Sequence, residues 1–249
     1  MKISPDSIIL WQHGALHINA TIAFTWLVML LLTGSAWLIT RRLSTGPEIS
    51  RWQNLLEVLV VGMRDQIRGI TGRPEGPYLP FVGTLFIFVL TANLLVIVPG
   101  FQPPTGSLST ATALAISVFI AVPVYGIAYE GPARYLKHYL KPTILMLPFN
   151  LIGEISRTIA LAVRLYGNVM SGTVIVAILL TLVPFFFPVV MQLLGLITGT
   201  IQAYIFAILA TVYIASATAA QTSEPDRKDD SSVKPNINHV SKGDTHGKP

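Results

Sequence analysis

Residues 143–183 read TILMLPFNLIGEISRTIALAVRLYGNVMSGTVIVAILLTLV, a stretch dominated by aliphatic side chains. It is about twice as long as the ~20 apolar residues that cross a bilayer. It also contains Glu154, Arg157 and Arg164. One arginine at the bilayer centre costs from about 3 to above 10 kcal/mol, so charged residues inside an apolar span are candidates for function. The stretch therefore predicts a long membrane helix with a functional polar face.

The polar residues of this stretch share one face of the predicted helix. Glu154 and Arg157 are three residues apart and can pair with each other. Arg164 lies roughly 15 Å beyond Glu154 at ~1.5 Å per residue, and no other acid lies in an apolar span. Because a guanidinium does not lose its proton, Arg164 needs an anion from another molecule or a water-filled cavity. The face comprises Asn150, Glu154, Arg157, Leu161, Arg164, Asn168 and Ser171.

Three segments resemble the a subunit of the F-type ATP synthases. SRTIALAVRLYGNVMSG at 156–172 and QAYIFAILATVYIASA at 202–217 are similar to its paired signature helices. NLLVIVPGFQPPTGSLSTATALA at 93–115 is similar to its NLLGLIPG-like run and the proline- and threonine-rich turn that follows. The resemblance covers roughly residues 80–220.

The resemblance implies a role for Arg164, which matches the essential arginine of the family's RLFGN or RLYGN segment. That arginine faces the carboxylate of each passing c-ring subunit, makes it release its ion, and blocks leakage between two aqueous half-channels. Gln202 matches the glutamine near the arginine, with a plain interhelical hydrogen bond as the alternative. Asn168 and Ser171 either line a channel or serve packing.

The family function that follows is ion translocation coupled to ATP synthesis or hydrolysis, by a subunit that is not itself catalytic. The implied partners are the c-ring, b-type peripheral stalk subunits and the lipid bilayer. No cofactor, metal or nucleic acid is expected. The residues expected to form the ion path are Arg164, Gln202, Asn168, Ser171 and Thr173, with Asn150, Glu154 and Arg157 as a supporting polar face.

The chain departs from the family pattern at two positions. Many members carry a glutamate just after the NxxxG run and a histidine or glutamate on the facing helix. This chain has Thr173 and Gly195 there. A proton relay benefits from groups that titrate, whereas a sodium path needs oxygen ligands and a hydrated route. Both proton and sodium therefore stay open as the coupling ion.

The composition of the chain is that of a polytopic membrane protein. Of its 249 residues, 52% are hydrophobic and 12% are charged, against roughly 25% charged residues in soluble domains. Cysteine is absent, which excludes disulfides and thiolate metal sites.

We predict an all-α fold with about five membrane-crossing helices and one interfacial amphipathic helix, within a single membrane domain at 1–220. The helix at 48–71 has an apolar stripe opposite most of its charges, as a helix lying in the membrane interface does. The last two helices exceed a perpendicular span, so we expect them to be strongly tilted. A polar tail at 221–249 is predicted to be disordered. The crossing segments are predicted at 20–40, 79–98, 108–129, 143–183 and 187–220.

The distribution of basic residues predicts the orientation. Of the 17 basic residues, six lie between the first and second spans, three in the loop at 130–142 and five in the tail. Five crossings put all of these on one side, and the positive-inside rule makes that side cytoplasmic. We therefore predict a multi-pass protein of a bacterial plasma (inner) membrane, with the N-terminus outside and the C-terminus in the cytoplasm.

Two other functions are compatible with some of these features. A secondary transporter would use Arg164 to bind an anionic substrate near the midplane, but such folds often show internal repeats, and we find none. An intramembrane enzyme needs a nucleophile with a base, or a metal pair. Glu154 is the one acid in an apolar span, and no histidine lies in one.

Overall fold

The computed structural model describes residues 9–13, 16–41, 51–71, 78–98, 100–132, 146–182 and 187–219. The tail predicted at 221–249 lies outside these residues, as does most of the basic loop. Five of the described helices are long and apolar enough to cross a membrane. The prediction of an all-α polytopic membrane protein is confirmed, with one short hairpin, described below, that was not predicted. The five helices are α1 (Ala20–Thr40), α3 (Leu79–Leu94), α4 (Leu108–Glu130), α6 (Met146–Leu182) and α7 (Phe187–Ala219).

Proline and glycine mark the ends of the shorter spans. Pro80 lies in the first turn of α3, where a missing backbone N–H removes no helical hydrogen bond. After Leu94 the chain tightens into the 3-10 turn η2 (Leu95–Ile97). A second such turn, η3 (Pro104–Gly106), precedes α4. α4 ends at Gly131, whose φ of 80° suits a residue without a Cβ atom.

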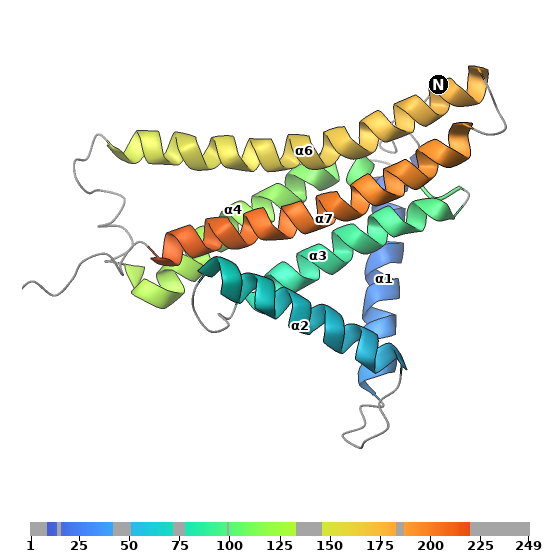
Figure 1. Ribbon diagram of the computed structural model, residues 1–249. Helices are drawn as coiled ribbons and strands as arrows, with labels where there is room; N and C mark the ends of the chain where they lie inside the picture. Colours follow the sequence, from blue (N-terminus) through green and yellow to red (C-terminus); the bar gives the residue numbers. More distant parts are fainter. Residues whose placement is uncertain are drawn as a thin grey trace, which may run out of the picture. The chain divides into compact units, whose positions relative to one another are not determined.

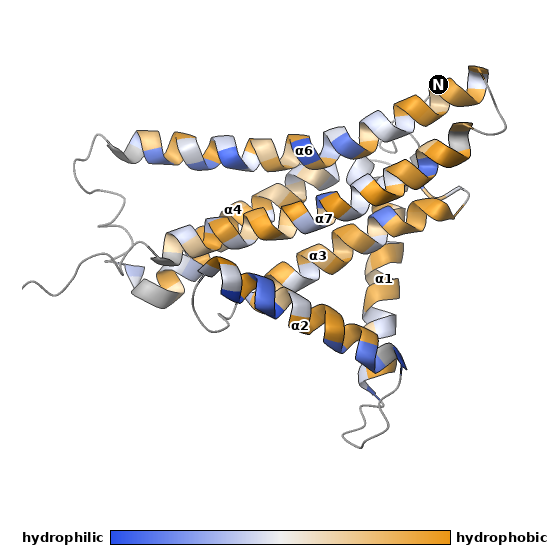
Figure 2. Ribbon diagram, in the orientation of Figure 1, coloured by the Kyte–Doolittle hydropathy of each residue, from blue (hydrophilic) through white to orange (hydrophobic). Residues whose placement is uncertain are grey.

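The helix α2 (Arg51–Thr71) differs from the other helices in composition. It is strongly amphipathic and is not among the five apolar helices. Figure 2 shows hydrophilic and hydrophobic residues along α2, whereas the other helices are mostly hydrophobic. Its location in the membrane interface stays a prediction.

The centre of the helical bundle is α7, which contacts α2, α3, α4 and α6. Ala203, Ala207 and Ala210 of α7 are at most 4% exposed. Such small side chains allow helices to approach closely in a membrane protein. α6 runs beside α7 and α4 at the edge of the bundle, and the axis of α1 runs across those of α6 and α7 (Figure 1).

A short antiparallel hairpin precedes α1, and the sequence analysis did not predict it. β1 (Ile9–His13) pairs with β2 (Leu16–Asn19), with an irregularity between Ile9 and Trp11. The segment lacks the Asn-Gly or Asp-Gly turn that signals hairpins most strongly, which explains why the pattern did not reveal it.

Candidate functional site

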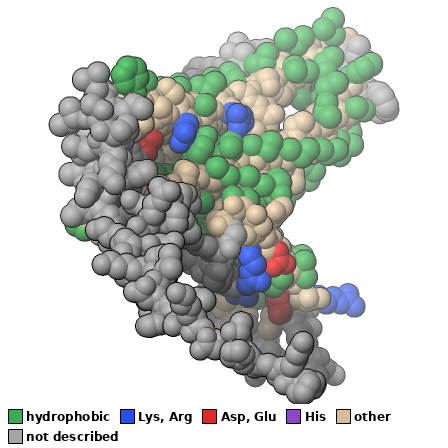
Figure 3. Space-filling view, turned by 60° about the vertical axis from the view of Figure 1, so that its left-hand side comes forward, with side chains coloured by type: hydrophobic (Ala, Val, Ile, Leu, Met, Phe, Trp, Pro, Cys, Tyr) green, Lys and Arg blue, Asp and Glu red, His purple; other side chains and the backbone are tan. Residues whose placement is uncertain are grey.

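Arg164 lies in the middle of α6, on a surface that the other described residues leave uncovered. Leu161 and Leu165 beside it are 1% and 0% exposed and pack in a hydrophobic cluster with α4 and α7. Arg164 itself is exposed, as are the neighbouring Ile159 and Val163. Within the described part of the chain, Arg164 has no hydrogen-bond or ion-pair partner. An unpaired guanidinium therefore stands among apolar side chains, and Figure 3 shows basic side chains set in a largely hydrophobic face.

The pairing of α6 with α7 brings Arg164 level with Gln202. The side-chain amide of Asn168 donates to the carbonyl oxygen of Thr198, with a distance of 3.3 Å between nitrogen and oxygen. Arg164 comes four residues before Asn168, and Gln202 comes four residues after Thr198. Because the two helices run antiparallel (Figure 1), one turn back on α6 and one turn forward on α7 reach the same level.

Gln202 faces the inside of the bundle at that level. Its side chain is 5% exposed, and its Nε2 atom is buried with no hydrogen-bond partner in the described residues. An unpaired buried donor costs about 1–3 kcal/mol. This cost favours a further partner for the amide, either water or a group from another subunit. Arg164 and Gln202 thus occupy the outer and inner sides of one level of the helix pair.

A cavity of about 290 Å³ lies on the N-terminal side of Arg164 along α6. Asn150, Glu154 and Arg157 of α6 line it together with Ser216 of α7. The guanidinium carbon of Arg157 lies 5.7 Å from the centroid of the Tyr213 ring, within the range of a cation–π interaction. The predicted supporting polar face therefore lines a cavity against the C-terminal part of α7.

A second cavity, of about 240 Å³, lies on the other side of Arg164. It is enclosed by α6, α7, the end of α3 and residues 100–103. The Oε1 atom of Gln102 is buried and has no hydrogen-bond partner in the described residues. None of the side chains that line this cavity in the described part of the chain is ionisable. Its polar side chains are Asn93, Gln102, Asn168, Thr173 and Gln192.

Asn93 fixes the wall of this second cavity. Its side chain is 4% exposed; the Nδ2 atom donates to the carbonyl oxygen of Gly199 at 2.8 Å, and the Oδ1 atom accepts from Thr105 Oγ1 at 2.8 Å. A Cβ atom at Gly199 would lie 3.1 Å from the Cβ atom of Asn93. Asn93 thus forms an interhelical hydrogen bond, and Gly199 is the glycine that permits the close approach of α3 and α7.

The hydroxyl groups of the two remaining predicted ion-path residues, Ser171 and Thr173, form hydrogen bonds within α6. Ser171 Oγ donates to the carbonyl oxygen of Asn168, and Ser171 lines neither of the two cavities. Thr173 Oγ1 donates to the carbonyl oxygen of Val169, although Thr173 does line the second cavity.

The sequence analysis did not select Gln102, Gln192 or Tyr213 for the site. Gln102 could have been selected from the sequence, because it is a polar side chain in the uncharged link at 99–107. Gln192 lies on the same broad face of the last helix as Gln202, but its donation to the Val96 carbonyl oxygen at 2.9 Å depends on η2, which the sequence does not locate. The contact of Tyr213 with Arg157 likewise depends on the register of α6 and α7.

Comparison with known proteins gives one consistent result. The family model described as ATP synthase A chain matches residues 22–215, a range that also includes most of α1 and all of α2. ATP synthase subunit a 2 of Acaryochloris marina is 59% identical over 233 residues, which cover 94% of this chain and 99% of that protein. ATP synthase subunit a of Albidiferax ferrireducens is 59% identical, with 91% and 98% covered. ATP synthase subunit a 1 of Chlorobaculum parvum is 61% identical, with 88% and 96% covered.

Proposed function

The chain belongs to the ATP synthase A chain family, and on this premise we propose that it forms the stationary wall of the ion path beside the c-ring. The observation that carries the proposal is the exposed Arg164, which has no partner in the described residues and has the exposed apolar side chains of Ile159 and Val163 beside it. A charge in such a surface is costly unless an anion meets it. The carboxylate of a c-ring subunit supplies that anion.

The electrostatic role of Arg164 follows from its fixed charge. A nearby positive charge favours the ionised form of an approaching carboxylate, so the c-ring carboxylate releases its ion when it comes opposite Arg164. The same charge repels cations that would pass along the chain without the rotor. Gln202 lies at the same level on the inner side of the helix pair, and its uncharged amide does not neutralise the guanidinium.

Two half-channels reach Arg164 from opposite sides in this proposal. The cavity of Asn150, Glu154 and Arg157 forms part of one, and the cavity of Asn168 and Thr173 forms part of the other. At ~1.5 Å per residue, Arg164 is about 10 Å along the helix axis from Arg157 and about 6 Å from Asn168. An ion can then pass from one cavity to the other only by riding on the c-ring.

We further propose that the coupling ion is the proton or sodium, and the lining of the second cavity favours sodium. The described lining of the second cavity offers amide and hydroxyl oxygens but no ionisable side chain. Hard cations are bound by such oxygens, whereas proton relays in membranes are built from Asp, Glu and His. ATP hydrolysis and ion transport by the reconstituted complex should therefore require sodium. Full activity in sodium-free buffer would assign the path to protons.

The wider setting of the chain is also part of the proposal. The chain is a multi-pass membrane protein, and its family assembles into ATP synthase. We propose a bacterial inner membrane, an external N-terminus and a cytoplasmic C-terminus, from the distribution of basic residues. Contacts with b-type stalk subunits complete the stationary part, and the chain itself performs no catalysis and binds no cofactor.

The deciding experiment replaces Arg164 by alanine in the assembled ATP synthase in vesicles, with ATP synthesis and passive ion leak measured separately. We expect synthesis to be lost while the passive leak is retained or increased. Arg41→Ala serves as the matched control, because Arg41 is also exposed and lies 5.0 Å from the Trp37 ring at the end of α1, away from the cavities. Unchanged synthesis in Arg164→Ala would overturn the proposal and favour the transporter alternative.

A further inference from the structure

The second cavity contains three side-chain amides whose oxygen atoms have no hydrogen-bond donor in the described residues. They belong to Gln102, Asn168 and Gln192, which all line the cavity of about 240 Å³. Gln102 Oε1 is buried and unpaired, and the side-chain hydrogen bonds of Asn168 and Gln192 are donated by their nitrogen atoms. The proposed ion path gives no role to Gln102 or Gln192.

The hydrogen bond of Gln192 fixes the orientation of its amide. The Nε2 atom donates to the carbonyl oxygen of Val96 at 2.9 Å. Because a carbonyl oxygen can only accept, the nitrogen must face it, and the Oε1 atom of the same amide is left for a different ligand. Asn168 is held in the same way by the carbonyl oxygen of Thr198, at 3.3 Å. Both amides therefore keep an oxygen atom that can meet a cation.

The two amides lie at different depths along the helix pair. Asn168 is level with Thr198 through its hydrogen bond, and Gln192 comes six residues before Thr198. This separation is about 9 Å along the helix axis at ~1.5 Å per residue. Gln192 is exposed and lies close to the start of α7 at Phe187. An ion that enters from that end of the helix pair therefore reaches Gln192 before Asn168, which is one turn from Arg164.

Uncharged oxygen ligands in successive positions suit the passage of a cation. Such oxygens replace part of the hydration shell of an ion, and conduction also requires binding that is weak enough to release it. We propose that Gln192 is a sodium ligand at the entry of the second cavity and that Asn168 receives the ion beside Arg164. This inference rests on the proposed function, because it deepens the role of one half-channel, and it makes Gln192 a residue that determines ion specificity.

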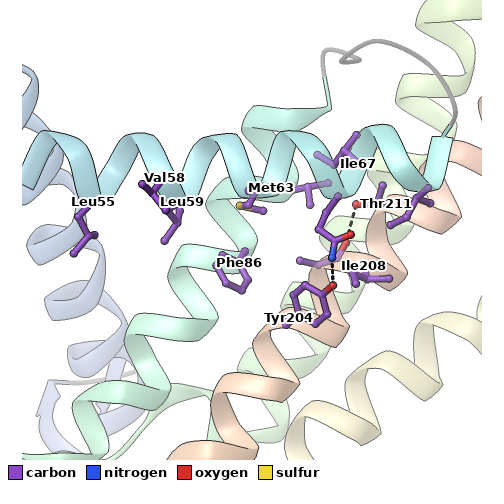
Figure 4. Close-up of a pocket in the computed structure, with 14 residues that line it drawn as sticks. Leu55, Val58, Leu59, Met63, Ile67, Phe86, Tyr204, Ile208 and Thr211 are labelled. Atoms are coloured by element: carbon purple, nitrogen blue, oxygen red, sulfur yellow. Dashed lines mark hydrogen bonds between the residues drawn. The ribbon is translucent and has the colours of Figure 1, made fainter.

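Gln66 provides a matched comparison for Gln192. Its Nε2 atom donates to the hydroxyl oxygen of Tyr204, which joins α2 to α7 beside the apolar groove drawn in Figure 4. Both glutamines are exposed, and both donate from the amide nitrogen to a different element of the chain. Of the two, only Gln192 lines the second cavity. A purely structural role would therefore make their substitutions similar, whereas a role as ion ligand separates them.

Protection of a cysteine by sodium tests the site directly. The chain has no cysteine of its own, and Gly195 lines the second cavity at a position where a Cβ atom would meet no atom within 4 Å. Gly195→Cys in the assembled ATP synthase is treated with 2-aminoethyl methanethiosulfonate, in sodium chloride or in choline chloride of equal ionic strength. Mass spectrometry measures the adduct on this chain. We expect sodium to slow the labelling several-fold, and equal rates in the two salts would overturn the proposal.

Further substitutions in the Gly195→Cys chain identify the ligand. Gln192→Leu should remove the protection by sodium, whereas Gln66→Leu should retain it. Gln192→Glu keeps an oxygen ligand but loses the amide N–H group that donates to Val96, so the protection should persist. If the glutamate and leucine variants lose protection equally, Gln192 acts through its hydrogen bond to Val96, and its assignment as an ion ligand is overturned.

The sodium dependence of ATP hydrolysis gives a second readout in chains that retain Gly195. The sodium concentration for half-maximal hydrolysis should rise several-fold in Gln192→Leu, and saturating sodium should restore much of the lost rate. Gln66→Leu should match the wild type. An unchanged sodium dependence in Gln192→Leu, or an equal rise in both variants, would contradict a role as ion ligand.

The labelling experiment is independent of the test of Arg164, because it needs neither ATP nor a moving rotor. Sodium protection combined with unchanged synthesis in Arg164→Ala would support the cation site and overturn the role proposed for Arg164. Lost synthesis in Arg164→Ala without sodium protection in Gly195→Cys would overturn the cation site alone.

Discussion

The two long helices that form the site are built for opposite surroundings. In the most apolar window of α7, 33% of the residues are buried inside the chain, against 6% in α6. α7 contacts four other helices, and its Gln202 is buried. α6 packs along one side, and its Arg164 is exposed. The difference indicates that this chain covers more of α7 than of α6, so that α6 presents the larger uncovered surface to another molecule.

The largest difference between the two helices should appear when one glycine in each of them is replaced by valine. A Cβ atom at Gly199 of α7 would lie 3.1 Å from Asn93, whereas one at Gly167 of α6 would meet no atom within 4 Å. We expect Gly199→Val to force α3 and α7 apart and to remove most of the chain from the purified complex. Gly167→Val should leave the chain folded.

The amount and thermal stability of the chain in detergent-purified complexes measure both variants. If Gly199→Val is as stable as the wild type, α7 is not held as tightly as described. If Gly167→Val instead destabilises the free chain, the surface of α6 is not open in the way its burial indicates.

A middle-sized effect is expected from the hydrogen bonds of Asn93. Asn93→Leu leaves the Thr105 hydroxyl and the Gly199 carbonyl oxygen without their partner, which should lower the free energy of unfolding by about 1–3 kcal/mol. Ser171→Ala on α6 is the comparison, because Ser171 Oγ bonds within its own exposed helix. Denaturant titration should show a clear shift for Asn93→Leu and almost none for Ser171→Ala; similar shifts would remove the contrast between the helices.

The smallest effect concerns the contact that joins the outer helix to the inner one. The Arg157 guanidinium lies over the Tyr213 ring, an interaction worth about 0.5–1 kcal/mol at an exposed site. Tyr213→Leu should lose this amount, and Tyr213→Phe should keep most of it. Thermal unfolding of the two variants measures the difference. Equal loss in both would assign the role of Tyr213 to its hydroxyl group.

The sequence was sufficient for the parts of this chain that depend on local composition. Long apolar runs predicted the membrane helices, and the helix predicted at 143–183 extends from Met146 to Leu182. The sequence also revealed the polar face, but it did not show which residues of that face are buried. Leu161 is 1% exposed, while Arg164 is exposed. Periodicity defines a face, whereas the edge of burial depends on where α4 and α7 lie.

The contacts of the site depended on tertiary structure in the same way. The closure of the second cavity by Gln102 requires the path of residues 100–103, which contain no helix or strand. The level shared by Arg164 and Gln202 requires the Asn168–Thr198 contact. Neither follows from spacing along one helix. Resemblance to the a subunit named Arg164 and Gln202, but it gave no account of which one is buried.

The shared level of Arg164 and Gln202 constrains how related chains can change in length. One residue inserted in α6 between Arg164 and Asn168 would shift the arginine by about 1.5 Å along the axis and turn it by about 100°. A matching insertion in α7 would restore the level but not both orientations. Evolution can therefore lengthen this pair of helices beyond the site or in the segment at 183–186, while the stretch from Arg164 to Asn168 and that from Thr198 to Gln202 must keep their lengths together.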